Sequence, residues 1–328
     1  MMTMLDYINA IPEYIGEHRD RGDYQKLRED YLKENRKSVT IVASGSSNNA
    51  SRCALYSLKG LLHKEVNVYT PYTFVNYEQI DPETFYIVIS QSGRSRNTLE
   101  VIDRLKEAGI TIHFITDNKE IEDDELLKVY QLDVGNEEIP FVTKGMSSTI
   151  YFLMRYAGAQ FSENFADGFR TCQKEAEACD KENKEVLDQI RRVHIIGSGA
   201  YQAVACEGAL KFCETMQIAA SGYETEEFLH GGNFELLRDH LIIAIDSEKD
   251  HQRVLQLKQS HHVLCDHFIK VDTAKDFNEH EAVILCLAFF QTLAYLMNVA
   301  RGNPVPTMKD RYLEFEGLLK AKTVNYYQ

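Results

Sequence analysis

The chain has 328 residues, of which 44% are hydrophobic and 26% are charged, and its formal net charge is −14 at pH 7. This length allows two domains of ordinary size, and the composition is typical of a globular protein. Because the chain is acidic and has no basic stripe, we expect no nucleic-acid partner. An anionic ligand must then be held by backbone N–H groups, hydroxyls or a few local cations.

The cysteines and histidines indicate neither a disulfide framework nor a metal site. Seven cysteines without a CxxC pair indicate reduced thiols, or simply small core residues, in a cytoplasmic protein. The closest histidine pair, His261 and His262, lacks a second ligand at zinc spacing, so we expect no metal and no other cofactor. The first residues do not show a basic region followed by an apolar core, and we therefore expect no signal peptide.

Residues 1–37 are charged with a helical pattern of apolar positions, which predicts an arm packed on the body or on a partner chain. An apolar run at 39–43 then leads through Ser44-Gly45-Ser46-Ser47 into a helical pattern, and this order forms one βα unit. A helix is predicted at 98–108. Further strands are predicted at 66–69, 85–89, 110–116 and 126–132. The alternation predicts a parallel sheet covered by helices on both faces.

The pattern restarts in the second half, after a helical stretch at 146–161 and a charged connector at 173–189. A strand at 193–196 leads into Gly197-Ser198-Gly199, and these residues match the first strand and its turn at an offset of 154 residues. Strands are also expected at 241–245 and 268–271. The repeat predicts two similar α/β domains in tandem. We assign the arm to 1–37, the first domain to 38–185 and the second domain to 186–328.

An uncharged apolar segment at 282–300 is nearly long enough to cross a membrane. Gln291, Thr292 and Asn298 interrupt it, and it stands alone near the C-terminus. We interpret it as a helix buried in a core or in a subunit interface, and we expect no membrane association.

Two predicted strands of the first half end in dense hydroxyl groups, and a helix follows each of them. In parallel α/β sheets, ligands bind outside the carboxyl ends of the strands, where helix N-termini also point. The arrangement therefore predicts a phosphate site, although serines and threonines at such positions also serve as ordinary helix N-caps. No P-loop motif occurs, and the Gly197 turn lacks the third glycine of a dinucleotide fingerprint. The residues are Ser44, Ser46 and Ser47, and then Ser90, Gln91, Ser92, Ser95 and Thr98.

The segment 206–235 carries the second group of candidate residues. Glu207, Lys211 and Glu214 fall on one helix face, and a glycine-broken turn leads to His230. Two carboxylates, a lysine and a histidine can form a proton-transfer site. The same spacing also fits a surface helix with a Glu–Lys pair and a helix cap.

The pieces VASGSS, ISQSGRSRNT, VHIIGSGAYQAVACEGALKFCE and EEFLHGG, in this order and spacing, resemble the sugar isomerase (SIS) domain family. The resemblance covers about residues 38–326, and it is strongest to the isomerase half of glucosamine-6-phosphate synthase, to fructosamine-6-phosphate deglycases and to sugar-phosphate deaminases. It implies two tandem flavodoxin-like α/β domains, each a parallel sheet with helices on both faces. The glutaminase half of the synthase has no counterpart here, so we expect no glutaminase activity.

The resemblance also implies roles for matching residues. Glu214 matches the carboxylate that moves a proton between C1 and C2, and His230 matches the ring-opening histidine that a neighbouring subunit supplies in relatives. Lys322 matches a lysine that forms a Schiff base in the synthase, although deglycases need not use it. Lys144 resembles a loop lysine near the sugar, and Glu207 and Lys211 match positions that line the pocket. The phosphate and sugar-hydroxyl contacts match Ser46, Ser47, Ser90, Gln91, Ser92 and Ser95, with Thr98 opening the helix behind them.

Three departures from the family pattern bear on specificity. Arg94 and Ser95 replace the usual Glu-Thr, Gly232 replaces a proline, and the loop that contains Lys144 is short. Arg94 adds a cation beside the phosphate site. We expect it to reach a carboxylate on the substrate, such as that of an amino-acid conjugate.

The residue chemistry is compatible with these roles. A buried glutamate with a raised pKa can move a proton between adjacent carbons, a histidine suits ring opening, and a lysine can polarise a carbonyl or form an imine. We therefore predict a cytoplasmic homodimer that isomerises a 6-phosphorylated amino sugar or sugar–amine conjugate and releases the amine. Two alternatives remain: an isomerase or amine transferase like the synthase's isomerase half, and a sugar-phosphate sensor without turnover.

Overall fold

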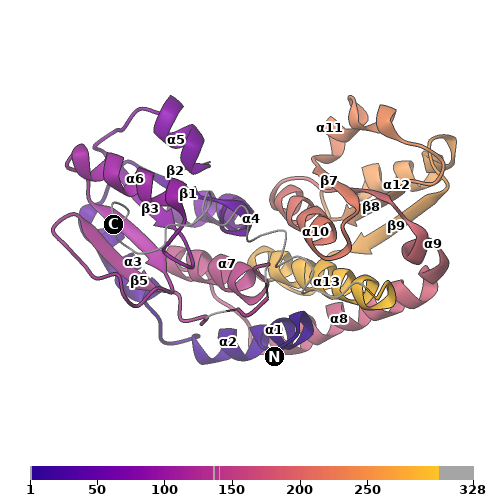
Figure 1. Cartoon of the computed structure of the whole chain (residues 1–328), viewed down its shortest axis with the longest axis horizontal. Helices are drawn as coiled ribbons and strands as arrows, with labels where there is room; N and C mark the ends of the chain where they lie inside the picture. Colours follow the sequence, from indigo (N-terminus) through magenta and orange to yellow (C-terminus); the bar gives the residue numbers. More distant parts are fainter. Residues whose placement is uncertain (1, 136, 140, 303–328) are drawn as a thin grey trace. The chain divides into compact units, whose positions relative to one another are not determined.

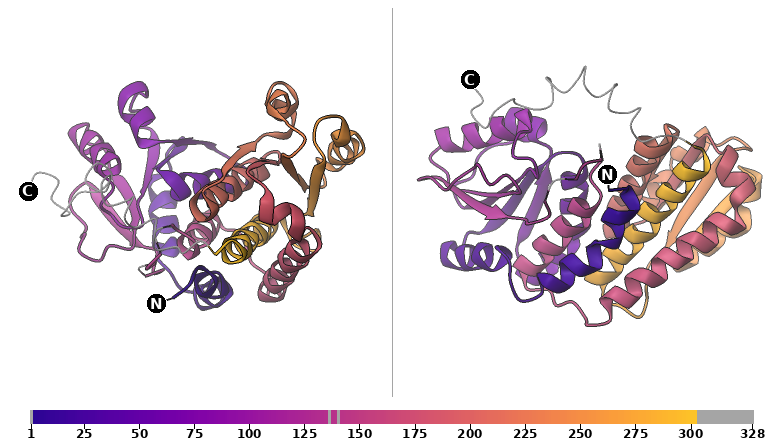
Figure 2. Two further views of the ribbon diagram at one scale, coloured as in Figure 1. Left: turned by 45° about the vertical axis from the view of Figure 1, so that its right-hand side comes forward. Right: turned by 60° about the horizontal axis from the view of Figure 1, so that its bottom comes forward.

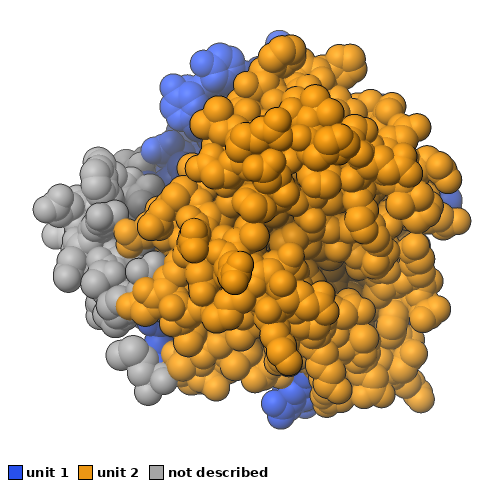
Figure 3. All heavy atoms as spheres, turned by 90° about the vertical axis from the view of Figure 1, so that its right-hand side faces the viewer, with its two compact units in different colours: residues 1, 13–160, 306–328 blue, residues 2–12, 161–305 orange. Residues whose placement is uncertain are grey.

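The computed structural model of the chain describes residues 2–135, 137–139 and 141–302 (Figure 1). These residues divide into two compact units: the first holds residues 13–160, and the second holds residues 2–12 together with the described residues from 161 on (Figure 3). The predicted arm is therefore shared between the units. The predicted boundary near residue 185 stays a prediction, and the contacts group residues 161–185 with the second unit.

The first unit contains a parallel sheet with the strand order β2-β1-β3-β4-β5. This is the flavodoxin-like order, with β1 next to β3 at the point where the order reverses. All six residues of β3 are buried, as expected for a parallel strand covered on both faces. The strands are β1 (Ser38–Ala43), β2 (Glu65–Tyr69), β3 (Thr84–Ile89), β4 (Ile112–Thr116) and β5 (Leu127–Gln131).

Helices cover both faces of this sheet (Figure 2). On one face lie α3 (Tyr24–Glu34), α4 (Gly45–Leu62) and α7 (Lys144–Ala157), and α7 packs against the other two. On the other lie α5 (Pro71–Tyr77) and α6 (Arg96–Glu107). Helix α6 turns Leu99, Ile102 and Leu105 into a core that also contains Val88 and Phe114. The short helix α2 (Ile11–Glu17) precedes α3.

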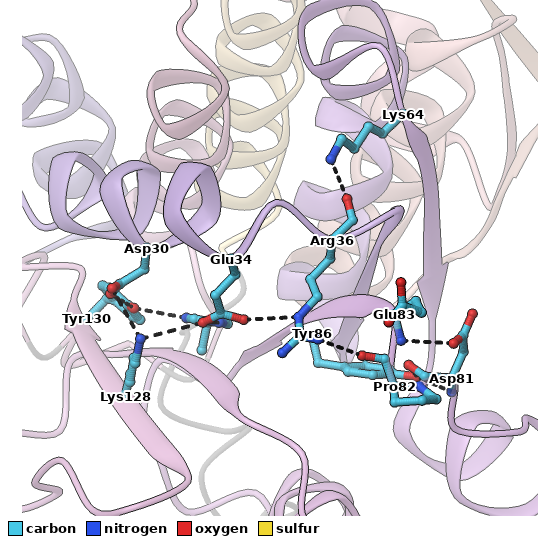
Figure 4. Close-up of polar contacts among 11 residues, drawn as sticks. Asp30, Glu34, Arg36, Lys64, Asp81, Pro82, Glu83, Tyr86, Lys128 and Tyr130 are labelled. Atoms are coloured by element: carbon cyan, nitrogen blue, oxygen red, sulfur yellow. Dashed lines mark hydrogen bonds and ion pairs between the residues drawn. The ribbon is translucent and has the colours of Figure 1, made fainter.

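A partly buried polar network connects α3 to β4 and β5 (Figure 4). Tyr130 donates a hydrogen bond to Asp30 (2.6 Å), and the ring of His113 lies between Tyr130 (2.9 Å) and Glu34 (3.2 Å). Lys128 pairs with Asp30 at 3.1 Å and with Glu34 at 3.5 Å. This part of the predicted arm is thus a fixed component of the first unit.

The second unit repeats the topology with four parallel strands in the order β7-β6-β8-β9. The order matches that of the first four strands of the first unit, which confirms the predicted fold class of two tandem α/β domains. Strand β7, which is short and contains Gly222, was not predicted from the sequence. A Cβ on Gly222 would lie 2.4 Å from the backbone nitrogen of Cys206, so glycine permits this close approach. The strands are β6 (Arg192–Ile196), β7 (Ala219–Tyr223), β8 (Leu241–Asp246) and β9 (His267–Asp272).

The helices of the second unit include the predicted charged connector, which is α8 (Phe165–Glu182) and α9 (Lys184–Gln189). Helices α8, α10 (Ala200–Met216) and α13 (Glu279–Ala300) pack together, and α1 (Met4–Asn9) contacts α13. Helix α12 (His251–Ser260) contacts β8 and β9. The remaining elements are α11 (Thr225–Leu229) and the 3-10 helices η1 (Gly232–Glu235) and η2 (His261–Val263).

Helix α13 is long and apolar enough to cross a membrane, but 83% of its most apolar window is buried. Its contacts with α8 and α10 account for this burial. The helix is thus a core helix of the second unit, as the polar interruptions in its sequence predict.

Candidate active site

The two serine clusters of the first unit lie at the same edge of the sheet. Strands β1 and β3 are parallel neighbours, with Ala43 opposite Ile89, so Ser44 and Ser90 leave the sheet side by side. The side-chain amide of Asn97 donates to the Ser44 hydroxyl at 3.0 Å and joins the two clusters. The hydroxyls of Ser90 and Ser95 are 3.3 Å apart. The structure therefore brings together residues that are about fifty positions apart in the chain.

These serines do not cap the helices that they precede. Ser44 is the N-cap residue of α4 and Ser95 is that of α6, and neither side chain accepts a hydrogen bond from the helix backbone. Ordinary N-capping is therefore not what these hydroxyls do. Two helix N-termini, each with a positive dipole end, point at this edge of the sheet, and such an arrangement favours an anion.

Gly45 and Gly93 shape the turns that carry these hydroxyls. Their φ angles are 54° and 63°, in the left-handed region that favours glycine. A Cβ on Gly93 would lie 2.6 Å from the side chain of Ile121. Asn118 supports the same turn by donating its side-chain amide to the backbone oxygen of Ser92 at 3.2 Å. Neither Asn97 nor Asn118 was among the predicted site residues, although Asn97 stands two positions after Ser95.

The other predicted phosphate residues differ in their accessibility. Ser46 is buried, and Ser47 is partly buried. The Ser92 hydroxyl accepts a hydrogen bond from the Arg94 backbone (3.3 Å). The hydroxyl of Thr98 is covered and has no hydrogen-bond partner among the described residues.

Arg94 lies beside this cluster, and its guanidinium pairs with the Glu120 carboxylate at 3.1 Å. The side chains of Arg94 and Glu120 are 41% and 67% exposed. A substrate carboxylate would therefore have to replace Glu120 to bind Arg94.

Lys144 and Gln91 are brought close through the first turn of α7. The Lys144 ammonium donates to the Val134 carbonyl at 3.1 Å and lies 5.3 Å from the centre of the Tyr14 ring. The next residue, Gly145, has the Gln91 side-chain amide directly above it, because a Cβ there would lie 2.3 Å from the Gln91 Oε1. The start of α7 thus forms part of the surroundings of the serine cluster.

In the second unit, α10 carries a buried ionic triad. The Lys211 ammonium lies 3.1 Å from Glu207 and 2.7 Å from Glu214. The side chains of Glu207 and Lys211 are 0% exposed, and that of Glu214 is 25% exposed. Complete burial excludes the alternative of an ordinary surface pair. Of the three side chains, only that of Glu214 is partly exposed.

The surroundings of the triad set the protonation of its members. Burial raises the pKa of Glu214, and the nearby Lys211 charge only partly opposes this effect. Burial alone would lower the pKa of Lys211, but the charges of Glu207 and Glu214 outweigh it and raise that pKa. The triad therefore combines a permanently charged ammonium with a carboxylate that takes up a proton more readily than an exposed glutamate does.

His230 follows α11 and closes its C-terminus. Its backbone N–H donates to the carbonyls of Glu226 (3.1 Å) and Glu227 (3.2 Å). His230 is exposed, and within the described part of the chain no residue hydrogen-bonds its imidazole. The ring is thus available as an acid or a base. Lys322 lies outside the described residues.

The strand ends of the second unit differ from those of the first. The Ser198 hydroxyl donates to Glu224 at 2.8 Å, and its backbone N–H donates to Asp250 at 3.3 Å. Asp246, the last residue of β8, is buried and contacts His251 (3.0 Å) and Lys270 (3.2 Å). No group of three or more metal-ligating side chains occurs in residues 2–135, 137–139 and 141–302.

Comparison with known proteins adds independent information. The SIS domain family model matches residues 32–124 and 186–263. A glutamine–fructose-6-phosphate aminotransferase (isomerizing) of Legionella pneumophila is 26% identical over 302 residues, which cover 82% of this chain and 49% of that protein. The chain thus spans about half the length of the curated relatives that it matches.

Two solved structures share the fold. A Clostridium difficile protein described provisionally as a phosphosugar isomerase superposes with a TM-score of 0.83 at 23% identity, covering 99% of this chain and 100% of that one. Glucosamine-6-phosphate deaminase of Thermotoga maritima superposes with a TM-score of 0.68 at 18% identity, covering 90% and 95% of the two chains.

Proposed function

The chain belongs to the SIS domain family, and on that premise we propose that it is an enzyme that acts on a 6-phosphorylated ketosamine or amino sugar, isomerising it and releasing the amine. The relatives include an aminotransferase that isomerises a hexose phosphate and a structural neighbour that deaminates glucosamine 6-phosphate. We further propose that the protein is cytoplasmic and acts as a homodimer.

The observation that carries this proposal is that the first unit has two helix N-termini without side-chain caps, and the second unit has a partly buried carboxylate of raised pKa. The uncapped N-termini of α4 and α6, lined by the hydroxyls of Ser44, Ser90 and Ser95, suit a phosphate dianion. The triad of α10 supplies the base, Glu214. A phosphosugar isomerase needs both features.

In the proposed reaction, the Glu214 carboxylate takes the proton from C1 of the ketosamine, and an enol forms between C1 and C2. Glu214 then returns the proton to C2, and a C1–N imine results. Water adds to C1, the C1–N bond breaks, and the amine leaves with an aldose 6-phosphate as the other product. Lys211, held by Glu207, stabilises the anionic form of Glu214 and the charge that develops at O2.

Ring opening requires a separate acid–base group at O5, and we assign this role to His230, supplied by the neighbouring subunit. Lys322 is the candidate for an imine with the keto group, a step that hydrolysis of the amine does not require. Lys144 and Gln91 are proposed to contact the sugar and its phosphate. Ser46, Ser47, Ser92, Ser95 and Thr98 complete the proposed phosphate site.

Arg94 bears on the choice of amine. If a substrate carboxylate displaces Glu120 from Arg94, the enzyme prefers amino-acid conjugates over plain amino sugars. The Arg94→Ala variant should then lose this preference in kcat/KM while it keeps activity on glucosamine 6-phosphate. An unchanged ratio of kcat/KM between the two substrate types would show that Arg94 does not recognise the amine part of the substrate.

The proposal is tested by a thermal-shift screen of ketosamine and hexosamine 6-phosphates, followed by an assay of ammonia or amino-acid release on the compounds that bind. Release of the amine supports a deglycase or deaminase. A change of sugar without release indicates an isomerase or transferase like the synthase's isomerase half. Binding without turnover indicates a sensor, and no binding contradicts the proposal.

A further inference from the structure

We propose that Glu137 is a positioning residue, which fixes the Gln91 side chain at the phosphate site through the first turn of α7. The inference rests on the function proposed above, because Gln91 is a phosphate contact only if that site binds a sugar phosphate. Neither the sequence motifs nor the family match, which ends at residue 124 in the first unit, points to Glu137.

The Glu137 carboxylate closes the N-terminus of α7. It accepts hydrogen bonds from the backbone N–H groups of Thr143 (2.9 Å), Lys144 (3.1 Å) and Gly145 (2.8 Å). The N-cap residue itself, Thr143, makes no side-chain cap hydrogen bond. A carboxylate six to eight residues upstream thus does the work of the cap, and it folds the connection between β5 and α7 back on the helix.

This N-terminus differs from those of α4 and α6. There the N-cap side chains leave the helix backbone without a side-chain acceptor. At α7, Glu137 already supplies the negative charge. A phosphate should therefore bind at the N-termini of α4 and α6, whereas the N-terminus of α7 holds Gln91 in place.

The first turn of α7 contacts the Gln91 side chain directly. Gly145 donates its N–H to Glu137, and the Gln91 amide lies against the Cα of the same glycine. The Gln91 Nε2 also donates to the carbonyl of Gly135 at 3.4 Å. The amide of Gln91 is thus held between Gly135 in the connection and Gly145 in the first turn of α7, and Glu137 fixes the position of Gly145.

Glu137 also helps to fix the position of Lys144, the other proposed sugar contact at the start of α7. The Lys144 backbone N–H donates to Glu137, and its ammonium donates to Val134 near the other end of the connection. Loss of the Glu137 charge would therefore loosen Gln91 and Lys144 together, without removing either side chain.

The test is a double-mutant cycle on the dissociation constant of glucosamine 6-phosphate, measured by calorimetry. We expect Glu137→Gln to weaken binding about three- to tenfold in the wild-type background and to have a clearly smaller effect in a Gln91→Ala background, where only its effect through Lys144 remains. Glu125→Gln is the matched control. It removes the same charge from an exposed glutamate of the first unit and should leave the dissociation constant unchanged.

Gly145→Ala provides a second route to the same answer. Its methyl group displaces the Gln91 amide and leaves the Glu137 carboxylate intact, so it should weaken binding by a similar factor and lose its effect when Gln91 is absent. This variant keeps the proposal testable if Glu137→Gln does not fold, which the melting temperature reveals.

Equal binding by wild type and Glu137→Gln, or effects of Glu137→Gln and Gln91→Ala that simply multiply, would overturn the role of Glu137 and leave the proposed function standing. Failure of the wild-type protein to bind any sugar 6-phosphate would instead overturn the proposed function, and the role of Glu137 with it.

Discussion

The carboxyl ends of the two sheets occupy the same place in the same topology, yet they carry opposite chemistry. In the first unit Ile41 pairs with Ile87, and in the second Ile195 pairs with Ile243, so Ser90 corresponds to Asp246. The first edge presents serine hydroxyls and two uncapped helices. At the second edge, carboxylates of the chain itself already occupy the equivalent donors: Glu224 and Asp250 on Ser198, and Asp246 on His251 and Lys270.

The difference indicates that the two units have different functions, although they share one fold. A phosphate approaching the second edge would meet several carboxylates and no open donor at Ser198, so we expect a single phosphate site, in the first unit. We propose that the second unit contributes its chemistry from α10, where burial raises the pKa of the Glu214 carboxyl. At the strand edge of the second unit, carboxylates of the chain itself occupy the anion position, and we propose that an external phosphate occupies it in the first unit.

The largest expected effect comes from Glu214→Gln, which keeps the shape of the side chain and removes its basicity. Turnover should fall about 10²- to 10⁴-fold, while the dissociation constant of the sugar phosphate stays within about threefold. In the wild type, the raised pKa of Glu214 should place the acid limb of the pH–rate profile above the value of about 4.3 for an exposed glutamate, because the reaction needs the carboxylate form. Retained turnover in the variant would refute the assignment.

Lys211→Met tests whether the triad depends on its central cation. Without that cation, Glu207 and Glu214 are left as two like charges in a buried site, and the free energy of unfolding should fall by about 3–5 kcal/mol. Denaturant titration measures the loss. The control Lys174→Met removes an exposed lysine of α8 and should change stability by less than about 0.5 kcal/mol. Equal stability of Lys211→Met and wild type would mean that the triad is not an ionic unit.

His194→Phe tests a second difference between the units, in the first strand of each sheet. His194 of β6 corresponds to Thr40 of β1. His194 is fully buried, stacks on Tyr223 and His240, and its ring nitrogens have no partner in the described part of the chain. Burial lowers its pKa to about 4 from about 6.5 in the unfolded chain. The unfolded state therefore binds more protons between these values. The stabilising effect of neutral His194 is complete above pH 6.5 and disappears as the pH falls towards 4.

The wild type should thus lose up to about 3 kcal/mol of unfolding free energy over this range through His194. His194→Phe should remove that part of the slope, whereas the exposed control His262→Phe should keep it. Denaturant titrations at several pH values between 7 and 4 measure the slopes. Parallel curves for wild type and His194→Phe would contradict the account of this residue.

The sequence allowed much of this architecture to be predicted, because apolar strands and small-residue turns have local patterns. Strand β7 escaped prediction because its five residues are small or half-buried and include Gly222. The charged stretch 173–189 was expected to be a connector, yet it forms helices whose exposed faces carry the charges. Both elements depend on tertiary packing, because β7 packs against α10 and the helices α8 and α9 pack against α13.

The site was predictable to a similar degree. The serines and the Glu207 helix carry local motifs, but the spacing of Glu207 and Lys211 is the same on a buried and on an exposed helix. Only the packing of α10 against α13 and β7 settles their burial. That Ser44 and Ser95 do not cap their helices depends on side-chain conformation. The contacts made by Glu137 span six to eight residues and have no sequence signature.

The most direct test compares the two strand edges by calorimetric titration of one sugar 6-phosphate. The account predicts that replacing Ser90 and Ser95 by alanine weakens binding about 10- to 100-fold, because charged hydrogen bonds to the phosphate are lost, and that Ser198→Ala leaves the affinity unchanged. Undiminished affinity of the Ser90/Ser95 variant, or an equal loss with Ser198→Ala, would contradict the claim that the first unit alone holds the phosphate.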